Sequence, residues 1–434
     1  MGHSAETTTQ KPILIIGAGV SGLLLAQYLR KTGLAPFRIF ERDADLTTRG
    51  LGWGLTLHWS LPALQSLLPE DLVRRLPEAY VDRLAVEEGR PSTFPFYDLS
   101  TGELIAKTPA ASESQRIRVT RDRLRRLFAT GLDIQWAKAV NNVQTAPDGS
   151  VTASFDDGTS CEGSLVVACD GSSSRIRGML FPDQQRYRIP VRLLGVKIDC
   201  TADEIEPLKQ LDPYFLQGAA SQNDSFMYFS VLDAPGNNRD GNGGKYVCQM
   251  VISWPVRGGF FNQATPISFP DTNEGGIELI KTFAETWVEP FRTLARRIPS
   301  DTEVKALELY DWPPPTGLRT TGHVALVGDA LHPMTMYRGE GANHAIVDVL
   351  DLVDLVIPQL LPSGEDSVSS LAVGGLRAAL NRYEDRVVAR TRPAVLASRQ
   401  ACVDAHQWNR INDKSPLLSR RMMNLDFDES DLSL

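Results

Sequence analysis

Three glycines, Gly17, Gly19 and Gly22, follow the apolar run Ile13–Ile16 at the spacing G-x-G-x-x-G. This order predicts a buried strand, a tight turn and a helix. The first glycine allows the bend, the second lets a pyrophosphate approach the backbone, and the third lets the helix pack closely on the strand. The free N–H groups and the positive end of the helix dipole would then face the phosphates.

An acidic residue stands in register with this turn. The next apolar stretch, Phe37–Phe40, ends in Glu41, 19 residues after Gly22. A carboxylate there accepts hydrogen bonds from a ribose 2′-hydroxyl and repels a 2′-phosphate. The pattern predicts a dinucleotide without that phosphate, FAD or NAD, and the alternative is a glycine-rich turn of an ordinary α/β protein.

Two later apolar runs end in similar residues. Ser164–Cys169 leads into Asp170-Gly171, and His323–Val327 leads into Gly328-Asp329. A glycine-bearing loop, Gly339–Asn343, then opens a predicted helix. The order is therefore strand, glycine turn and helix, then strand-Asp-Gly, then strand-Gly-Asp, with long insertions between them.

The intervening chain predicts the elements that position these motifs. Val140–Cys161 alternates and turns at two Asp-Gly pairs, which predicts two hairpins. Thr282–Arg297 predicts one helix, and Gly375–Trp408 predicts one or two long amphipathic helices. Arg121 stands at a predicted strand-to-helix junction, where a cation near phosphates is useful.

The composition is that of a soluble globular protein. The 434 residues are 42% hydrophobic and 23% charged, and the net charge of −8 argues against nucleic acid or an anionic membrane surface as a partner. No apolar run approaches the length of about 18 residues that a membrane span needs, and the polar residues 1–10 predict no signal peptide. Five cysteines without C-x-x-C spacing and six histidines without ligand spacing lead us to expect a cytoplasmic protein with reduced thiols and no metal.

Together, these motifs resemble those of the single-component FAD-dependent aromatic hydroxylases, the group A flavoprotein monooxygenases. The resemblance rests on GAGVSG with Glu41, on CDGSSSRIR at Cys169–Arg177, and on GDALHPM at Gly328–Met334 followed by GEGAN. It covers about residues 11 to 360.

The resemblance implies an α/β fold: a Rossmann-like FAD-binding domain of the para-hydroxybenzoate-hydroxylase type, an inserted mixed-sheet substrate domain, and C-terminal helices. The expected FAD-binding segments are residues 1–70, 108–185 and 315–365, the expected substrate domain is residues 71–107 and 186–314, and the C-terminal helical segment with a loose tail is residues 366–434.

The resemblance also implies which residues touch the cofactor. Glu41 would bind the adenosine ribose, Arg121 the FAD diphosphate and ribityl region, and Asp329 the ribityl chain. Asp170 would serve both FAD and a passing nicotinamide, and the loop after Gly339 would face the isoalloxazine, where a helix N-terminus stabilises the negative charge of the reduced flavin. The implied cofactor-binding set is Gly17, Gly19, Gly22, Glu41, Gly52, Gly54, Arg121, Asp170, Asp329, Gly339, Gly341, Ala342 and Asn343.

Three residues depart from the pattern of the family. Tyr337 stands where proline is usual, Glu340 where glutamine is common, and Leu331 where alanine is frequent. Tyr337 and Glu340 are expected to border the flavin pocket.

The implied activity is a monooxygenase reaction with a small molecule and O₂. NADPH or NADH would reduce FAD, and a flavin C4a-hydroperoxide would epoxidise or hydroxylate an electron-rich aromatic ring or alkene. The closest likeness is to fungal secondary-metabolite members that act on indole alkaloids and set off rearrangement to a spiro-oxindole. The alternatives are a non-oxygenating FAD oxidase or dehydrogenase and a non-catalytic GDI-like binding protein.

Two further residues are candidates for contact with the substrate. Arg192 is the single charged residue in the apolar run Ile189–Val196, so it either orients or protonates the substrate or faces outward on an alternating strand. Tyr228 is either a pocket residue or part of the core. His332 is expected to be a packing or capping residue.

Overall fold

A computed structural model of the chain describes residues 10–50, 52–237, 243–361 and 369–433. Residues 1–9, on which the expectation about a signal peptide mainly rests, lie outside the described part.

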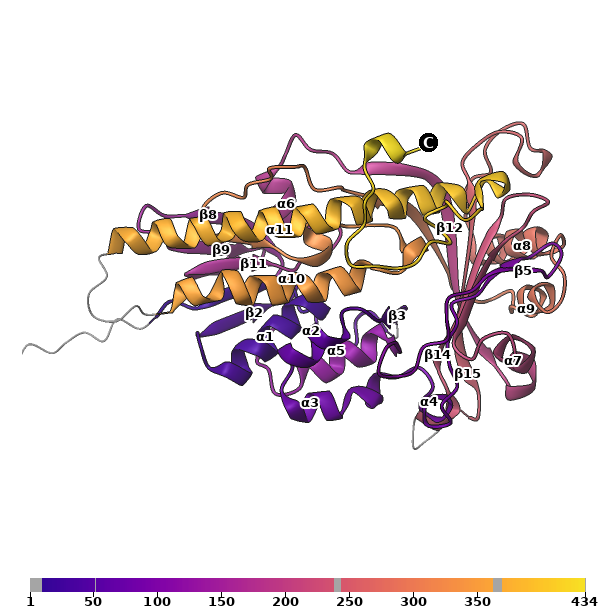
Figure 1. The fold of residues 1–434 in the computed structure, drawn as a ribbon, viewed down its shortest axis with the longest axis horizontal. Coiled ribbons are helices and arrows are strands. Elements are labelled where there is room, and N and C mark those ends of the chain that lie inside the picture. Colours follow the sequence, from indigo (N-terminus) through magenta and orange to yellow (C-terminus); the bar gives the residue numbers. More distant parts are fainter. Residues whose placement is uncertain (1–9, 51, 238–242, 362–368, 434) are drawn as a thin grey trace, which may run out of the picture.

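A five-stranded parallel sheet carries the glycine turn at the end of its central strand (Figure 1). The strand order is β17-β11-β1-β2-β7, and all residues of β1 and β11 are buried, which explains their unbroken apolar sequence. Because β17, β11 and β1 are adjacent and parallel, the three motifs that follow them meet at one edge of the sheet. The strands are β1 (Ile13–Ile16), β2 (Phe37–Phe40), β7 (Ile134–Gln135), β11 (Leu165–Ala168) and β17 (Val324–Leu326).

Helices cover one face of this sheet and a small antiparallel sheet lies on the other side. Helix α1 packs against α5 and α10, whereas β9 and β10 pack on β11 and β1. The two predicted hairpins of Val140–Cys161 are confirmed as the sheet β10-β9-β8, and β3 pairs with β6 in a separate two-stranded sheet. The elements are α1 (Val20–Thr32), β3 (Gly54–Leu57), α2 (Leu61–Leu67), α3 (Glu70–Arg74), β6 (Ile117–Thr120), α5 (Arg121–Ala129), β8 (Val140–Thr145), β9 (Val151–Phe155), β10 (Ser160–Gly163), α6 (Arg175–Leu180) and α10 (Gly341–Leu355).

A seven-stranded mixed sheet stands at the other end of the molecule, with α7, α8 and α9 on its outer side (Figure 1). Its order is β16-β12-β15-β14-β13-β4-β5, and every pair is antiparallel except β13 with β4. The elements are α4 (Arg83–Glu87), β4 (Phe96–Asp98), β5 (Leu104–Ala106), β12 (Tyr187–Cys200), α7 (Ala202–Lys209), β13 (Phe215–Ala219), β14 (Phe226–Asp233), β15 (Tyr246–Pro255), α8 (Asn273–Ala284), α9 (Phe291–Arg296) and β16 (Val304–Asp311).

The single helix expected over Thr282–Arg297 is wrong. Helix α8 ends at Ala284 and α9 begins at Phe291, directly after Pro290. Proline has no backbone N–H and its ring clashes with the preceding turn, so it separates the two helices.

Helix α11 (Ser369–Asp404) joins the two halves of the molecule (Figure 1). Leu380 belongs to the core around the parallel sheet, whereas Ala401 belongs to the core around the seven-stranded sheet. The chain beyond α11 differs from the loose tail that we expected, because Arg338 donates a hydrogen bond to Ser419 Oγ (2.8 Å) and the Ser433 N–H donates to Gln400 (2.8 Å).

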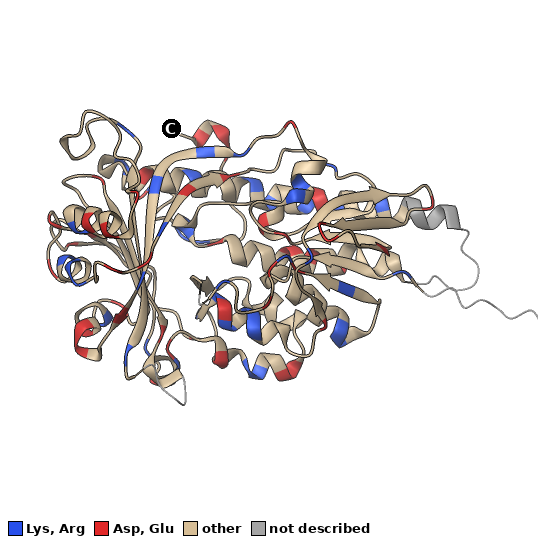
Figure 2. Cartoon of the chain, turned by 180° about the vertical axis from the view of Figure 1, so that it is seen from behind, with Lys and Arg blue, Asp and Glu red and all other residues tan. Residues whose placement is uncertain are grey.

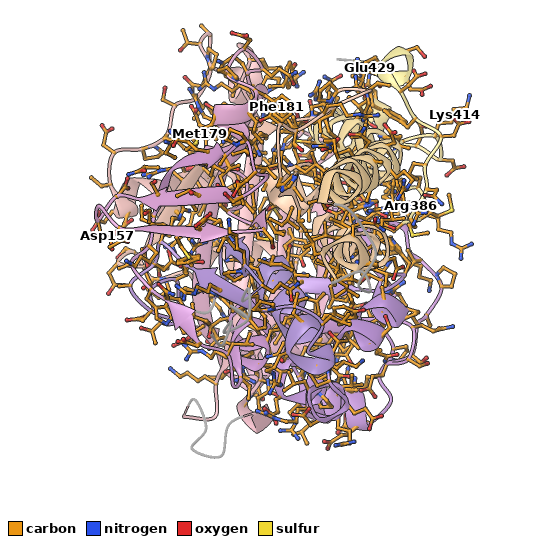
Figure 3. The ribbon with its side chains drawn as sticks, turned by 90° about the vertical axis from the view of Figure 1, so that its left-hand side faces the viewer. Asp157, Met179, Phe181, Arg386, Lys414 and Glu429 are labelled. Atoms are coloured by element: carbon orange, nitrogen blue, oxygen red, sulfur yellow. The ribbon has the colours of Figure 1, made fainter. Side chains whose placement is uncertain are left out.

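The surface mixes charges of both signs. Acidic and basic residues are interspersed over the helices and loops in Figure 2. Figure 3 shows the molecule end-on, with Asp157 of the β9–β10 turn on one side and Lys414 of the C-terminal segment on the other. Within the described ranges, no helix combines the length and apolar character needed to cross a bilayer, and no three His, Cys, Asp or Glu residues form a metal-binding group.

Candidate functional site

A cavity of about 860 Å³ is lined both by the glycine turn and by the seven-stranded sheet. It brings together residues from all three sequence motifs. The predicted residues that line it are Gly17, Gly19, Glu41, Gly54, Arg121, Asp170, Tyr228, Asp329, Gly339, Gly341 and Ala342. Four other predicted residues, Gly22, Gly52, Arg192 and Asn343, are not part of its lining.

The three glycines of the turn have different roles. Gly17 has φ +110°, and a Cβ there would lie 2.3 Å from the carbonyl oxygen of Cys169. A Cβ on Gly22 would lie 2.0 Å from the carbonyl oxygen of Gly17, whereas a Cβ on Gly19 would meet no atom within 4 Å. Gly17 and Gly22 therefore allow close packing of the turn, and Gly19 leaves open space toward the cavity.

Glu41 is held rigidly at the end of β2. Its Oε2 accepts a hydrogen bond from the Ala18 N–H (2.7 Å), and its Oε1 accepts one from the Asp43 N–H (3.0 Å). Arg125 Nη2 lies 3.6 Å from Oε2. These donors fix the carboxylate beside the glycine turn, where the sequence predicts the adenosine ribose.

Arg121 is the first residue of α5 and directly follows β6. The predicted strand-to-helix junction at this residue is therefore confirmed. Its backbone N–H donates to the carbonyl oxygen of Trp53 (3.0 Å). Burial lowers the pKa of its guanidinium, and the nearby Arg49 lowers it further. Over the described parts of the chain this guanidinium has no hydrogen-bond or ion-pair partner, so it can bind an anion such as a diphosphate.

Two carboxylates from neighbouring strand ends line the same cavity. Asp170 Oδ2 accepts the Arg175 N–H (2.9 Å) at the start of α6, while its Oδ1 is buried without a partner. Asp329 is exposed toward the cavity, and desolvation by the protein atoms packed around it raises the pKa of its carboxyl. No hydrogen bond to that carboxylate comes from the described residues. Both can therefore accept from hydroxyl groups of a ligand.

The loop at Gly339 directs a helix N-terminus at the cavity. Gly339 has φ +65°, and α10 begins two residues later at Gly341. The N–H groups of the first helical turn have no intrahelical acceptor, so they offer donors and a partial positive charge. Asn343 contributes differently from the prediction, because its side chain bonds His58 N–H (3.0 Å) and the carbonyl oxygen of Thr56 (2.9 Å) and thereby ties α10 to β3.

Tyr337 and Glu340 depart from the family pattern and were both expected to border the pocket. Only Tyr337 does so. Tyr337 lines the cavity and donates to Ser253 Oγ (2.7 Å). His406 Nδ1 must donate to the carbonyl oxygen of Cys402 (2.7 Å), so its Nε2 accepts from Ser253 (2.9 Å). Burial lowers the pKa of His406 to about 4, which keeps the ring neutral. The hydrogen bonds therefore run in one direction, from Tyr337 through Ser253 to His406.

Glu340 lies away from the cavity lining. Its carboxylate accepts from Arg338 Nε (2.8 Å) and from Trp59 Nε1 (3.3 Å), and both charged side chains are buried. The expectation that it borders the pocket is corrected, because this ion pair holds it inside the protein. His332 is buried and bonded to Asp348 (2.6 Å), as expected of a packing residue.

Arg192, a candidate for contact with the substrate, lies outside the cavity lining. Its neighbour Leu193 lines the cavity, and successive side chains of a strand point to opposite faces of the sheet. The Arg192 guanidinium donates to the carbonyl oxygen of Ile267 and lies 5.5 Å from the centroid of the Phe269 ring.

Sequence reasoning missed Arg118, a buried arginine that lines the cavity. It lies in β6, three residues before Arg121, within a run of arginines that resembles a solvated face. The available signal was the apolar residue on each side of it, Ile117 and Val119, which indicates a buried strand. A Cβ on Gly54 would lie 2.2 Å from Arg118 Nη2, so that glycine makes room for the guanidinium.

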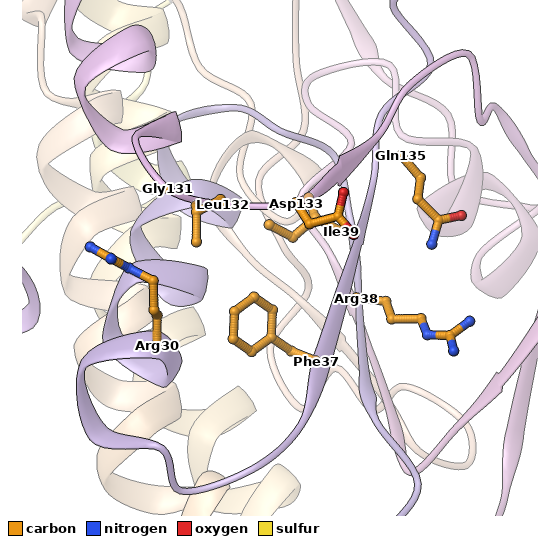
Figure 4. Close-up of a pocket in the computed structure, with 8 residues that line it drawn as sticks. All are labelled: Arg30, Phe37, Arg38, Ile39, Gly131, Leu132, Asp133 and Gln135. Carbon is orange, nitrogen blue, oxygen red and sulfur yellow. The ribbon is translucent and has the colours of Figure 1, made fainter.

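A second pocket, of about 510 Å³, lies at the outer edge of the parallel sheet (Figure 4). It contains none of the predicted site residues. Its lining residues are Arg30, Phe37, Arg38, Ile39, Gly131, Leu132, Asp133 and Gln135.

The comparisons with known proteins agree with this geometry. An FAD binding domain family matches residues 10–206. A probable FAD-dependent monooxygenase of Arthroderma benhamiae is 43% identical over 98% of each chain. The FAD-dependent monooxygenase tazP of Aspergillus terreus is 33% identical over 82% of this chain and 92% of its own.

Solved structures show the same fold. The 2,6-dihydroxypyridine-3-hydroxylase of Arthrobacter nicotinovorans aligns with a TM-score of 0.68 at 18% identity, over 98% of this chain and 99% of its own. HpxO of Klebsiella pneumoniae, complexed with FAD and uric acid, aligns with a TM-score of 0.65 at 19% identity, over 93% and 91%.

Proposed function

The chain belongs to the FAD-dependent monooxygenases, and we propose that it uses NADPH or NADH to oxygenate an electron-rich aromatic ring or alkene in fungal secondary metabolism. The observation that carries this proposal is one continuous cavity with two unlike ends. One end presents the glycine turn, Arg121, Asp329 and the start of α10, and the other end is walled by side chains of the seven-stranded sheet.

The residues present fit FAD. Gly19 leaves open space, and among the described residues Arg121 has no partner for its cation and Asp329 has no donor to its carboxylate, so they are available to a diphosphate and to ribityl hydroxyls. When bound, FAD supplies oxygen activated from O₂ after reduction by the nicotinamide. The N-terminus of α10 would stabilise negative charge on the reduced ring.

The opposite wall would orient the substrate and exclude water. Leu193, Phe226 and Met336 provide apolar surface suited to a planar ring, and Tyr337 adds a hydroxyl. The narrower proposal, an indole alkaloid whose oxygenation leads to a spiro-oxindole, rests on the sequence resemblance and on this apolar surface. Placement against such walls holds the reacting atoms close together.

Visible spectroscopy and isotope incorporation test the proposed function. We expect a yellow protein with bound FAD that oxidises NADPH or NADH faster when an aromatic substrate is added, and that transfers ¹⁸O from ¹⁸O₂ to the product. A colourless protein that FAD does not reconstitute contradicts the proposal. Oxidation of a substrate without incorporation of ¹⁸O would favour an oxidase or dehydrogenase.

A further inference from the structure

Arg118 is a buried cation in the wall of the cavity. Its side chain runs from β6 toward β14 and is 8% exposed. Nη1 donates to Thr56 Oγ1 (2.9 Å), and Nη2 donates to Tyr228 Oη (2.6 Å) and Ser230 Oγ (3.0 Å). Every one of these partners is an uncharged hydroxyl, so the hydrogen bonds leave the positive charge unbalanced.

The described residues supply no carboxylate within 4.0 Å of this guanidinium, and its Nε is buried without a partner. Asp212 is the acidic residue whose field reaches it, but the oxygens of Asp212 accept from the N–H groups of Thr93 (2.8 Å) and Tyr214 (3.0 Å). Burial lowers the pKa of Arg118, the direction expected for a cation taken out of water.

Among the described residues, the other buried arginines all pair with a carboxylate except Arg177. Arg390 pairs with Asp348 (2.8 Å), and Arg399 pairs with Asp311. Arg177 has no carboxylate partner and instead donates to three backbone carbonyls. An uncompensated buried charge is costly, so a cation with only hydroxyl partners at a cavity wall indicates that an anion binds there.

Aromatic rings surround the same charge. The guanidinium lies 5.2 Å from the centroid of the Phe215 ring and 5.8 Å from that of Tyr228. Tyr228 lines the cavity beside Arg118, and because its oxygen accepts from Arg118 it keeps its own proton to donate. This arrangement suits a charged oxygen attached to a flat ring.

We propose that Arg118, assisted by Tyr228, binds an anionic oxygen of the substrate, either a carboxylate or an ionised phenol. This inference rests on the proposed function and narrows its substrate to acidic aromatic compounds. An unsubstituted indole carries no group to meet the charge, so the inference favours acidic substrates over a neutral indole.

Three probes of similar shape test whether the protein prefers acidic compounds to a neutral one, which we call the charge preference. They are 2-naphthoate, 2-naphthol and the neutral 2-naphthamide. Each is titrated into the oxidised, FAD-loaded protein without reductant, and binding is followed by calorimetry and by the flavin spectrum. We expect at least one acidic probe to bind about tenfold or more tightly than the amide. The tighter of the two acids then tells whether a carboxylate or a phenol is the natural group.

Arg118→Met should abolish the preference for the acidic probes, whereas Arg192→Met, which removes an arginine outside the cavity lining, should retain it. Arg118→Lys keeps the charge without the planar fork and should weaken the preference several-fold. If the Arg118→Met protein does not fold, the Arg118→Lys protein provides the test of the preference instead. Tyr228→Phe should lower the affinity for the acids more than for the amide.

Three results would overturn the assignment. They are equal binding of the three probes by the wild-type protein, an unchanged preference in a folded Arg118→Met or Arg118→Lys protein, and loss of FAD itself from either variant, which would assign the charge to the cofactor. Failure of the proposed function is distinguishable, because charge preference without ¹⁸O incorporation contradicts only the proposed reaction. Incorporation without charge preference contradicts only the role of Arg118.

Discussion

The two walls of the cavity recognise their ligands by different means. The wall at the parallel sheet uses backbone, because open space at Gly19 and the N–H groups at the start of α10 face the cavity. The opposite wall uses side chains: Tyr228 lies on the seven-stranded sheet, Arg118 of β6 is bonded to Tyr228, and Tyr337 is bonded to Ser253 of β15. Backbone recognition demands glycines at fixed spacing, whereas side-chain recognition on a sheet demands only the correct face.

The largest effect should come from Gly22→Ala. The added Cβ would lie 2.0 Å from the carbonyl oxygen of Gly17, a backbone atom that cannot rotate away. We expect a loss of about 3 kcal/mol or more in the free energy of unfolding, together with loss of bound FAD. Urea unfolding of the FAD-free protein measures the first effect. An alanine variant of wild-type stability would show that the turn does not need close packing at this position.

Gly19→Ala should separate binding from folding. Its φ of −83° is ordinary for alanine, and the new methyl would meet no protein atom within 4 Å. We expect unfolding of the FAD-free protein to change by less than about 0.5 kcal/mol, because no protein contact is disturbed. FAD affinity should fall by about tenfold or more, because the methyl would occupy space that a pyrophosphate needs. Unchanged affinity in a fluorescence titration would contradict the dinucleotide role of this turn.

The same contrast explains what could be predicted from the sequence. The parallel sheet, the meeting of the three motifs and the strand-to-helix place of Arg121 were all readable, because backbone geometry restricts which residues can stand there. Asn343 was read correctly as part of the motif, but its side chain serves β3 rather than the cavity. A motif fixes where the backbone runs and leaves open which way a side chain points.

On the seven-stranded sheet, the sequence predicts that successive side chains point to opposite faces. It does not predict which of these faces borders the cavity. Arg192 and Leu193 are adjacent, and nothing in an apolar strand tells which of them faces the cavity. Arg118, on β6 of the two-stranded sheet, was hidden for another reason: it stands among other arginines, although the apolar residue on each side of it indicated a buried strand. Pro290, in contrast, was a local signal that should have divided the predicted helix, because its effect does not depend on the rest of the fold.

Asp329→Asn examines a side chain on the backbone-built wall. The wild-type carboxylate is open to the cavity, and burial raises its pKa, so a neutral amide should not destabilise the FAD-free protein. We expect FAD affinity to fall by about five- to twentyfold, because hydrogen bonds to a charged acceptor are stronger than those to an amide. Affinity is measured by titration of the FAD-free protein and stability by thermal unfolding. A large loss of stability with unchanged affinity would assign Asp329 a structural role.

Arg192→Ala should have the smallest effect, although it removes a charge from the strand next to the cavity. The guanidinium bonds a backbone carbonyl and lies over Phe269, outside the cavity lining. Loss of these contacts should cost about 1 kcal/mol or less in the free energy of unfolding. We expect kcat/KM to stay within about twofold, because this side chain is not part of the cavity lining. A fall of tenfold or more, with FAD content unchanged, would place Arg192 at the substrate and remove the difference between the two faces of β12.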